Sequence, residues 1–110
     1  MRAFLLPVVA AAAVLAAGCG GSTNSEPVAA TEVEMVKSYT FDPKVIEVEA
    51  GDTVTWTNKD NFTHTVQVKG QEDHKVERGA SVEITFYKPG TYDYVCTLHS
   101  QDMDGTVIVK

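Results

Sequence analysis

The feature that most constrains the fold is a series of short runs in which apolar and polar residues alternate, each run ending in a turn. Alternation places every second side chain on the same face of a strand. The same-face sets are Ile46 with Val48, Val54 with Trp56, His64 with Val66 and Val68, Val82 with Ile84 and Phe86, and Tyr92 with Tyr94 and Cys96. Turn residues such as Gly51-Asp52 and Pro89-Gly90 separate the runs. The pattern predicts an all-β domain, a sandwich or barrel rich in antiparallel pairs, in which Trp56 and also Met35 belong to the core.

No segment after residue 31 is long and amphipathic enough to predict a helix with certainty. The polar segment 69–75 is expected to be a loop with room for one helical turn. Within it, His74 lacks apolar neighbours and is interpreted as a surface histidine.

The first 18 residues have the composition of an export signal. Arg2 precedes an apolar run over 4–17 that is shorter than the roughly 20 residues needed to span a bilayer. The segment 15–19, Leu-Ala-Ala-Gly-Cys, resembles a bacterial lipobox, with Ala16 where the commonest pattern has leucine. We therefore expect residues 1–18 to be a lipoprotein signal peptide and Cys19 to be lipidated. The alternative is an ordinary signal peptide in which Cys19 has no special role.

Residues 19–31 then form a lipidated cysteine and a flexible tether of small and polar residues, and residues 32–110 form the folded domain. Two cysteines in an exported chain could instead form a Cys19–Cys96 disulfide. If Cys19 carries lipid, Cys96 remains a single thiol. Small exported domains usually depend on disulfides or metals for stability, so a metal is the remaining option.

The charge balance excludes one class of partner. Of the nine basic residues only Arg2 precedes Cys19, so the chain from Cys19 onward has eight basic and 15 acidic residues and a net charge of −7. Nucleic-acid binding needs a basic surface, and this chain does not offer one.

The chemistry-bearing residues gather at two predicted strand ends. His64 begins its run and Cys96 ends its run, both on the inward face, and His99 and Met103 follow in the same terminal loop. Taken singly, an inward histidine or cysteine is more often an ordinary core residue. One thiolate, two imidazoles and a thioether are together the ligand set of a mononuclear blue copper site.

The chain from about residue 33 to residue 110 resembles the small cupredoxins of the plastocyanin and amicyanin type. The resemblance rests on Phe41-x-Pro43, Gly51-Asp52-x-Val54-x-Trp56-x-Asn58, His64-Thr65-Val66, Gly90-x-Tyr92-x-Tyr94-x-Cys96 and the loop Cys96-x-x-His99-x-x-x-Met103-x-Gly105. It implies a Greek-key β-sandwich with one copper ion at one end, held by His64, Cys96, His99 and Met103. Three residues separate His99 from Met103, and this spacing varies within the family.

The resemblance implies further roles around these four residues. The backbone N–H of Thr65 is expected to bond the Cys96 sulfur and so to tune the reduction potential. Electrons are expected to leave through the outer ring edge of His99, within an apolar patch that includes Leu98 and Phe62.

These observations predict a one-electron carrier on one type 1 copper ion, and no enzyme. Its partners would be a redox donor and acceptor, such as a cytochrome or a copper or haem enzyme. The alternative function is copper storage or delivery; a zinc site with Asp102 as fourth ligand is a weaker alternative. We expect a monomer, exported and anchored by lipid to a bacterial membrane, facing the periplasm or the cell exterior.

Overall fold

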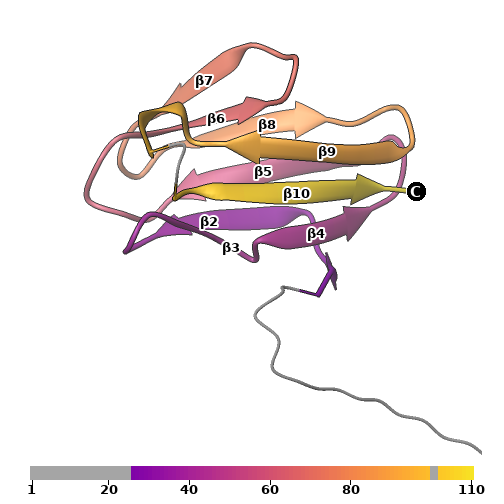
Figure 1. The fold of residues 1–110 in the computed structure, drawn as a ribbon, viewed down its shortest axis with the longest axis horizontal. Helices are drawn as coiled ribbons and strands as arrows, with labels where there is room; N and C mark the ends of the chain where they lie inside the picture. The colour runs from indigo at the N-terminus through magenta and orange to yellow at the C-terminus, as the bar shows by residue number, and fades with distance from the viewer. Residues whose placement is uncertain (1–25, 100–101) are drawn as a thin grey trace, which may run out of the picture.

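Within the part of the chain that the structure describes, ten strands form two sheets that pack around one core (Figure 1). The structure, a computed structural model, describes residues 26–99 and 102–110. The strands are β1 (Val28–Ala29), β2 (Glu32–Val36), β3 (Thr40–Asp42), β4 (Val45–Val48), β5 (Thr53–Asn58), β6 (His64–Val68), β7 (Asp73–Val76), β8 (Ser81–Thr85), β9 (Gly90–Val95) and β10 (Asp104–Val109). A single 3-10 turn, η1 (Thr97–His99), joins β9 to the last loop. The predicted all-β Greek-key sandwich is confirmed.

The larger sheet has the order β1-β4-β10-β9-β6-β7, and the smaller has the order β3-β2-β5-β8. β10 pairs in parallel with β4 and antiparallel with β9, and β6 pairs antiparallel with both β9 and β7. The loop between β9 and β10 therefore lies at the same end of the larger sheet as the start of β6. This topology brings Cys96 to His64 across 32 residues of sequence.

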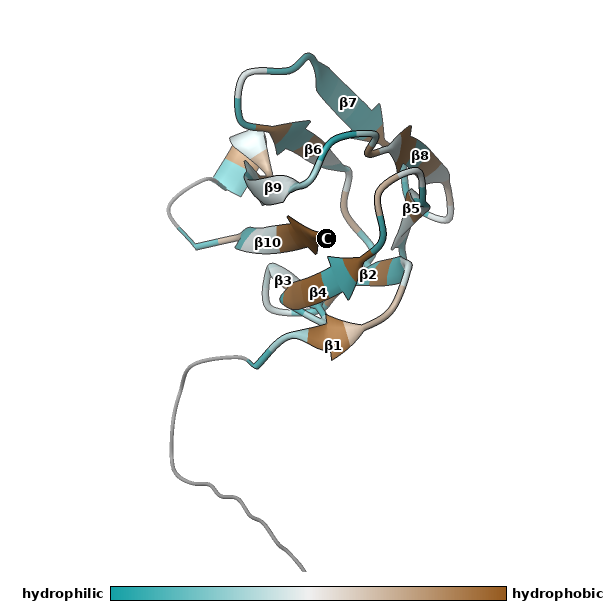
Figure 2. Cartoon of the chain, turned by 90° about the vertical axis from the view of Figure 1, so that its right-hand side faces the viewer, coloured by the Kyte–Doolittle hydropathy of each residue, from teal (hydrophilic) through white to brown (hydrophobic). Residues whose placement is uncertain are grey.

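Alternation of apolar and polar residues produces the core, as the brown and teal bands along the strands show (Figure 2). Trp56 and Met35 are fully buried, as predicted, and Trp56 packs edge-on against Tyr94 with ring centroids 5.1 Å apart. Val82, Ile84 and Tyr92 share the predicted inward faces but are only partly buried. These three side chains pack against the margin of the buried cluster.

Gly105 fixes the distance between β9 and β10. It pairs with Tyr94 in the ladder, and a β-carbon at this position would collide with the Tyr94 ring and approach the Lys44 carbonyl oxygen to 2.7 Å. Only glycine allows β10 to lie so close to Tyr94. The constraint holds the strand that follows Met103 in place.

Two expectations need correction. The tether was expected to reach residue 31, but Val28 and Ala29 already pair with Ile46 and Glu47 as β1. Two residues are too few for alternation to reveal a strand, and the free edge of β4 provides the pairing. The segment 69–75 contains no helical turn: its last residues form β7 against β6, so His74 lies opposite Val66 and is half-buried.

The described residues contain no helix long and apolar enough to cross a membrane. The predicted signal peptide and Cys19 lie outside the described residues.

Candidate metal centre

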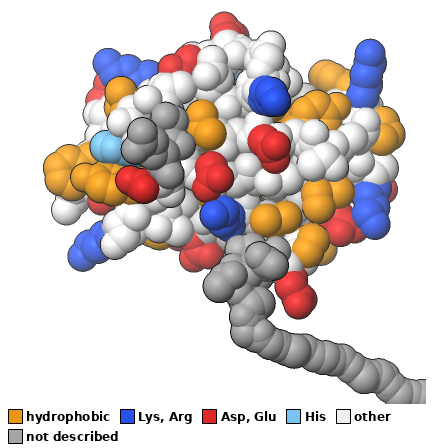
Figure 3. Space-filling view, in the orientation of Figure 1, with side chains coloured by type: hydrophobic (Ala, Val, Ile, Leu, Met, Phe, Trp, Pro, Cys, Tyr) orange, Lys and Arg blue, Asp and Glu red, His pale blue; other side chains and the backbone are white. Residues whose placement is uncertain are grey.

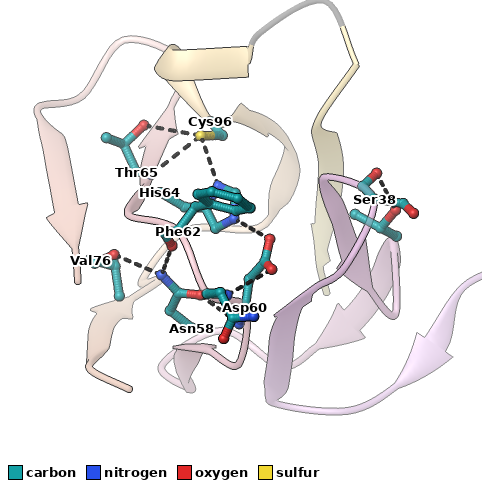
Figure 4. A network of polar contacts seen from close by, with 10 residues as sticks. Ser38, Asn58, Asp60, Phe62, His64, Thr65, Val76 and Cys96 are labelled. Atoms are coloured by element: carbon teal, nitrogen blue, oxygen red, sulfur yellow. Dashed lines mark hydrogen bonds and ion pairs between the residues drawn. The ribbon is translucent and has the colours of Figure 1, made fainter. Parts of the chain in front are cut away.

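His64 and Cys96 come together at one end of the sandwich, and both are completely buried. His64 is the first residue of β6, and Cys96 directly follows the last residue of β9. The imidazole Nδ1 of His64 lies 3.7 Å from the Cys96 sulfur. Figure 4 shows the two side chains pointing toward each other. Within the described part of the chain, Cys96 is the only cysteine, and its thiol is free.

The backbone of the terminal loop ties Cys96, His99 and Met103 into a closed ring of hydrogen bonds. The N–H of Cys96 donates to the Met103 carbonyl at 3.0 Å, the N–H of Met103 donates to the His99 carbonyl at 2.9 Å, and the N–H of His99 donates to the Cys96 carbonyl at 3.0 Å. The η1 turn provides the last of these bonds. Met103 is fully buried, and His99 is partly exposed. These backbone hydrogen bonds fix the positions of the three residues relative to one another.

Asp60 determines which nitrogen of His64 is free. Its carboxylate oxygen Oδ2 lies 2.8 Å from His64 Nε2, and both residues are buried. The hydrogen bond from His64 holds the pKa of Asp60 below its usual value, with a further contribution from the Asn61 backbone N–H and against the effect of burial. An ionised carboxylate only accepts hydrogen bonds, so Nε2 carries a hydrogen, and in the neutral imidazole the lone pair is then on Nδ1, on the side of Cys96.

Asn58 supports this arrangement from the end of β5. Its side-chain amide donates to the carbonyls of Phe62 and Val76 at 2.8 and 2.9 Å, and its oxygen accepts the N–H of Asp60 at 2.9 Å (Figure 4). These three bonds hold the turn between β5 and β6 in one conformation. The carboxylate of Asp60 is thereby aimed at His64.

Thr65 contacts the sulfur as the resemblance implied. Its backbone N–H donates to Cys96 Sγ at 3.3 Å. A donor aimed at a thiolate stabilises its negative charge, and such contacts tune a metal bound to that sulfur.

Tyr39 covers His99, a contact that the sequence did not reveal. The two rings stack with centroids 4.1 Å apart and planes at 25°, and the centroid of His64 lies 5.5 Å from that of His99. Tyr39 lies in the turn between β2 and β3, where Ser38 and Tyr39 both have positive φ values, 70° and 55°. Non-glycine residues rarely adopt this conformation, and here it places the Tyr39 ring over the terminal loop.

Exposed apolar side chains surround this end of the molecule. Phe62 and Leu98 are 59% and 57% exposed, and Tyr39 is 39% exposed. In Figure 3, hydrophobic side chains gather beside a histidine at the end of the sandwich where β9 leads into η1. The buried donors are thus separated from solvent by an apolar rim.

Asp102 and His74 are not among the buried donors. Asp102 is exposed, and its backbone N–H donates to the His99 carbonyl at 3.0 Å. His74 is held in β7. In residues 26–99 and 102–110, no three His, Cys, Asp or Glu side chains already lie within ligand distance of a common point.

Comparison with known proteins assigns the chain and its fold to one family. The cupredoxin-like domain family matches residues 8–109. The chain is 35% identical to amicyanin-alpha of Methylorubrum extorquens, over 96% of this chain and 92% of that protein. It is 31% identical to plastocyanin of Scenedesmus fuscus, over 64% of this chain and 86% of that protein.

Solved structures agree. An oxidised proline-to-glycine mutant of amicyanin superposes with a TM-score of 0.66 at 32% identity, over 74% of this chain and 82% of that one. A purple cupredoxin from Nitrosopumilus maritimus has a TM-score of 0.67 at 24% identity, over 74% of this chain and all of that one. The second likeness supports the fold alone.

Proposed function

The chain belongs to the cupredoxin-like family, and we propose that four side chains hold its one copper ion: His64, Cys96, His99 and Met103. The chain is a type 1 copper electron carrier and not an enzyme, as its amicyanin and plastocyanin relatives indicate. One observation carries the ligand assignment. Asp60 engages Nε2 of His64 and leaves Nδ1 directed at the buried Cys96 sulfur.

The separation of these two atoms fits a shared metal ion. Two ligands at 120° around one metal ion, with zinc-like bond lengths of roughly 2.0 Å to nitrogen and 2.3 Å to sulfur, would lie about 3.7 Å apart. Nδ1 and Sγ are 3.7 Å apart. When bound, the copper ion supplies the one-electron chemistry, and Cys96, two imidazoles and a weakly held thioether are the donors that such an ion takes.

Burial favours a carrier over a storage or delivery protein. His64, Cys96 and Met103 have no exposed surface, and the loop that bears the last two is closed by its own hydrogen bonds. A rigid, enclosed set of donors changes little between two oxidation states, which suits electron transfer. Delivery of copper needs an open site from which the ion is released, and only His99 reaches the surface.

Electrons are proposed to pass through His99, at the centre of the apolar rim formed by Tyr39, Phe62 and Leu98. An apolar surface of this kind allows a redox donor and an acceptor to approach in turn without the cost of desolvating charges. We propose a monomer in solution, with cytochromes or metal-containing redox enzymes as partners.

We also propose that the protein is exported and held at a bacterial membrane by lipid on Cys19. The support is the apolar run over 4–17 and the lipobox-like segment 15–19. Eight residues, 20–27, then separate Cys19 from β1, so the domain would stay within about 30 Å of the membrane. Intact mass of the native protein and of Cys19→Ala tests this proposal. Acyl chains on the first protein and none on the second support it; an unmodified native protein contradicts it.

The ligand assignment is tested by adding Cu(II) to the domain and recording its visible spectrum. An intense blue absorption from the Cys96 thiolate is expected, and Cys96→Ser should abolish it. The metal-free variant should unfold at nearly the same denaturant concentration as the metal-free wild type, because serine is close to cysteine in size. A wild-type copper complex without this absorption would contradict the assignment.

A further inference from the structure

A line of hydroxyl groups links a surface carboxylate to the buried sulfur. Asp73, the first residue of β7, accepts a hydrogen bond from Thr97 Oγ1 at 2.8 Å. Thr97 Oγ1 lies 2.8 Å from Thr65 Oγ1, and the backbone N–H of Thr97 donates to Thr65 Oγ1 at 2.6 Å. Thr65 Oγ1 lies 3.7 Å from Cys96 Sγ. We call Asp73, Thr97 and Thr65 the hydroxyl chain.

Only one arrangement of the hydroxyl hydrogens fits the contacts of the hydroxyl chain. A carboxylate only accepts, so the single hydroxyl hydrogen of Thr97 is used on Asp73. The short contact between the two threonine oxygens then needs the hydrogen of Thr65. That hydrogen is the one that could otherwise point to the Cys96 sulfur, at a longer distance. The sulfur keeps only the backbone N–H of Thr65 as a donor from this residue.

We infer that Asp73 is a positioning residue for the copper thiolate: through Thr97 it turns the Thr65 hydroxyl away from Cys96. The inference rests on the proposed role of Cys96 as a ligand. Nothing in the sequence pattern indicated Asp73, which lies 23 residues before Cys96 in a polar segment. The ladder between β6 and β7 brings it to the site, with Gln67 opposite Asp73.

The arrangement should hold the reduction potential down. A hydroxyl hydrogen bond to the sulfur stabilises negative charge there, and this charge is greater when copper is reduced. Asp73 withholds that bond in the native protein. Removing Asp73 lets Thr97 donate to Thr65, and the Thr65 hydroxyl is then free to turn to Cys96 Sγ.

The test compares Asp73→Ala with Glu72→Ala by redox titration of the copper protein. Glu72 is the exposed neighbour of Asp73, so its removal takes away the same charge. Asp73→Ala should raise the potential beyond the Glu72→Ala value by roughly tenfold in the Cu(I):Cu(II) ratio, about 59 mV for one electron. The visible band should also move to shorter wavelength, because a hydrogen-bonded thiolate gives up its electron less readily. Equal potentials for the two variants would overturn the inference.

Two threonine variants distinguish the proposed redirection of the Thr65 hydroxyl from a direct effect of the Asp73 charge on the copper ion. In Thr65→Val the hydroxyl is absent, and in Thr97→Val the link to Asp73 is absent. In either background, adding Asp73→Ala should shift the potential no further than adding Glu72→Ala does. A full additional shift in both backgrounds would show that Asp73 acts by another route, and would overturn the inference.

A measurement on the metal-free protein checks the contact itself. Denaturant unfolding of Asp73→Ala, Thr97→Val and the double variant should show non-additive losses, because the two side chains bond each other. Additive losses would contradict the hydroxyl chain. The outcomes also separate the two proposals: a missing blue band in the wild type refutes Cys96 as ligand, whereas a normal band with no Asp73 effect refutes only the role of Asp73.

Discussion

The ring of Tyr39 lies stacked on the ring of His99, with centroids 4.1 Å apart. Two successive residues with positive φ, Ser38 and Tyr39, make this contact possible. One face of the proposed ligand His99 is therefore covered by a side chain from the other sheet. The stack should orient His99 before copper binds.

We predict that Tyr39→Leu removes the stacking energy that holds the His99 ring in the metal-free protein. Tyr39→Phe should keep this energy, because phenylalanine keeps the stacked ring. A double-mutant cycle of Tyr39→Leu with His99→Ala, followed by denaturant unfolding, should give a coupling free energy of about 1 kcal/mol. Tyr87→Leu is a matched control, since Tyr87 is a tyrosine with 76% of its surface exposed. A cycle with zero coupling, the same as for Tyr87, would show that the stack does not hold His99.

We predict that Asp60→Asn weakens copper binding by roughly 10- to 100-fold, the usual effect of losing the group that orients a ligand histidine. The variant removes the negative charge that keeps the hydrogen on Nε2 of His64. Competition with a chelator of known affinity measures the change. Asp104→Asn is the control, because it removes the same charge from a largely solvated ion pair, in which Asp104 Oδ1 lies 3.2 Å from Lys44 Nζ. Equal copper affinities for the two variants would contradict the role of Asp60.

Local alternation predicted the runs that form β4, β5, β6, β8 and β9, and with them the residues at the strand ends. His64 shares the inward face of Val66, and Cys96 shares that of Tyr94; the fold needed only to bring these strand ends together. The 3.3 Å contact of the Thr65 N–H with the sulfur follows from the same strand positions.

The supporting residues could not be found in this way. Tyr39 reaches His99 from a tight turn 60 residues earlier in the chain. The positive φ values in this turn occur at non-glycine residues, so the sequence does not indicate them. Asp73 and Thr97 meet because β7, in which three of the four residues are polar, pairs with β6. Asp60 alone left a weak signal, as a carboxylate four residues before a candidate ligand. Contacts set by tertiary pairing leave little trace in a single sequence.

Leu98→Glu should slow electron exchange with a redox partner roughly tenfold while the visible spectrum stays nearly unchanged. Leu98 is 57% exposed in η1, next to His99, so a charge there must be desolvated when a partner docks, at a cost of about 1.4 kcal/mol. Stopped-flow mixing with the partner measures the rate. Val28→Glu, in the edge strand β1 and 45% exposed, introduces the same charge elsewhere. If both variants exchange at the same rate, the docking surface lies elsewhere.

Met103 should affect the reduction potential of the copper ion more than the affinity with which the ion is bound. Its side chain is fully buried, and its backbone is fixed by the bonds to Cys96 and His99, so a substitution changes the donor without releasing the loop. As a weak axial ligand, it contributes little to binding beside the three planar donors. Met103→Gln brings a harder oxygen that favours Cu(II), so the potential should fall. Met103→Leu removes the donor and keeps the pocket apolar, so the potential should rise.

Redox titration of both variants measures the change, and each shift should reach roughly tenfold in the Cu(I):Cu(II) ratio, or about 59 mV. Both proteins should stay coloured, because the Cys96 bond to copper remains. Met35→Leu is the matched control: Met35 is equally buried but lies in the core strand β2, and its replacement conserves volume. If Met103→Gln and Met103→Leu leave the potential at the Met35→Leu value, the Met103 thioether does not approach the copper, and the loop would then hold the ion with His64, Cys96 and His99 alone.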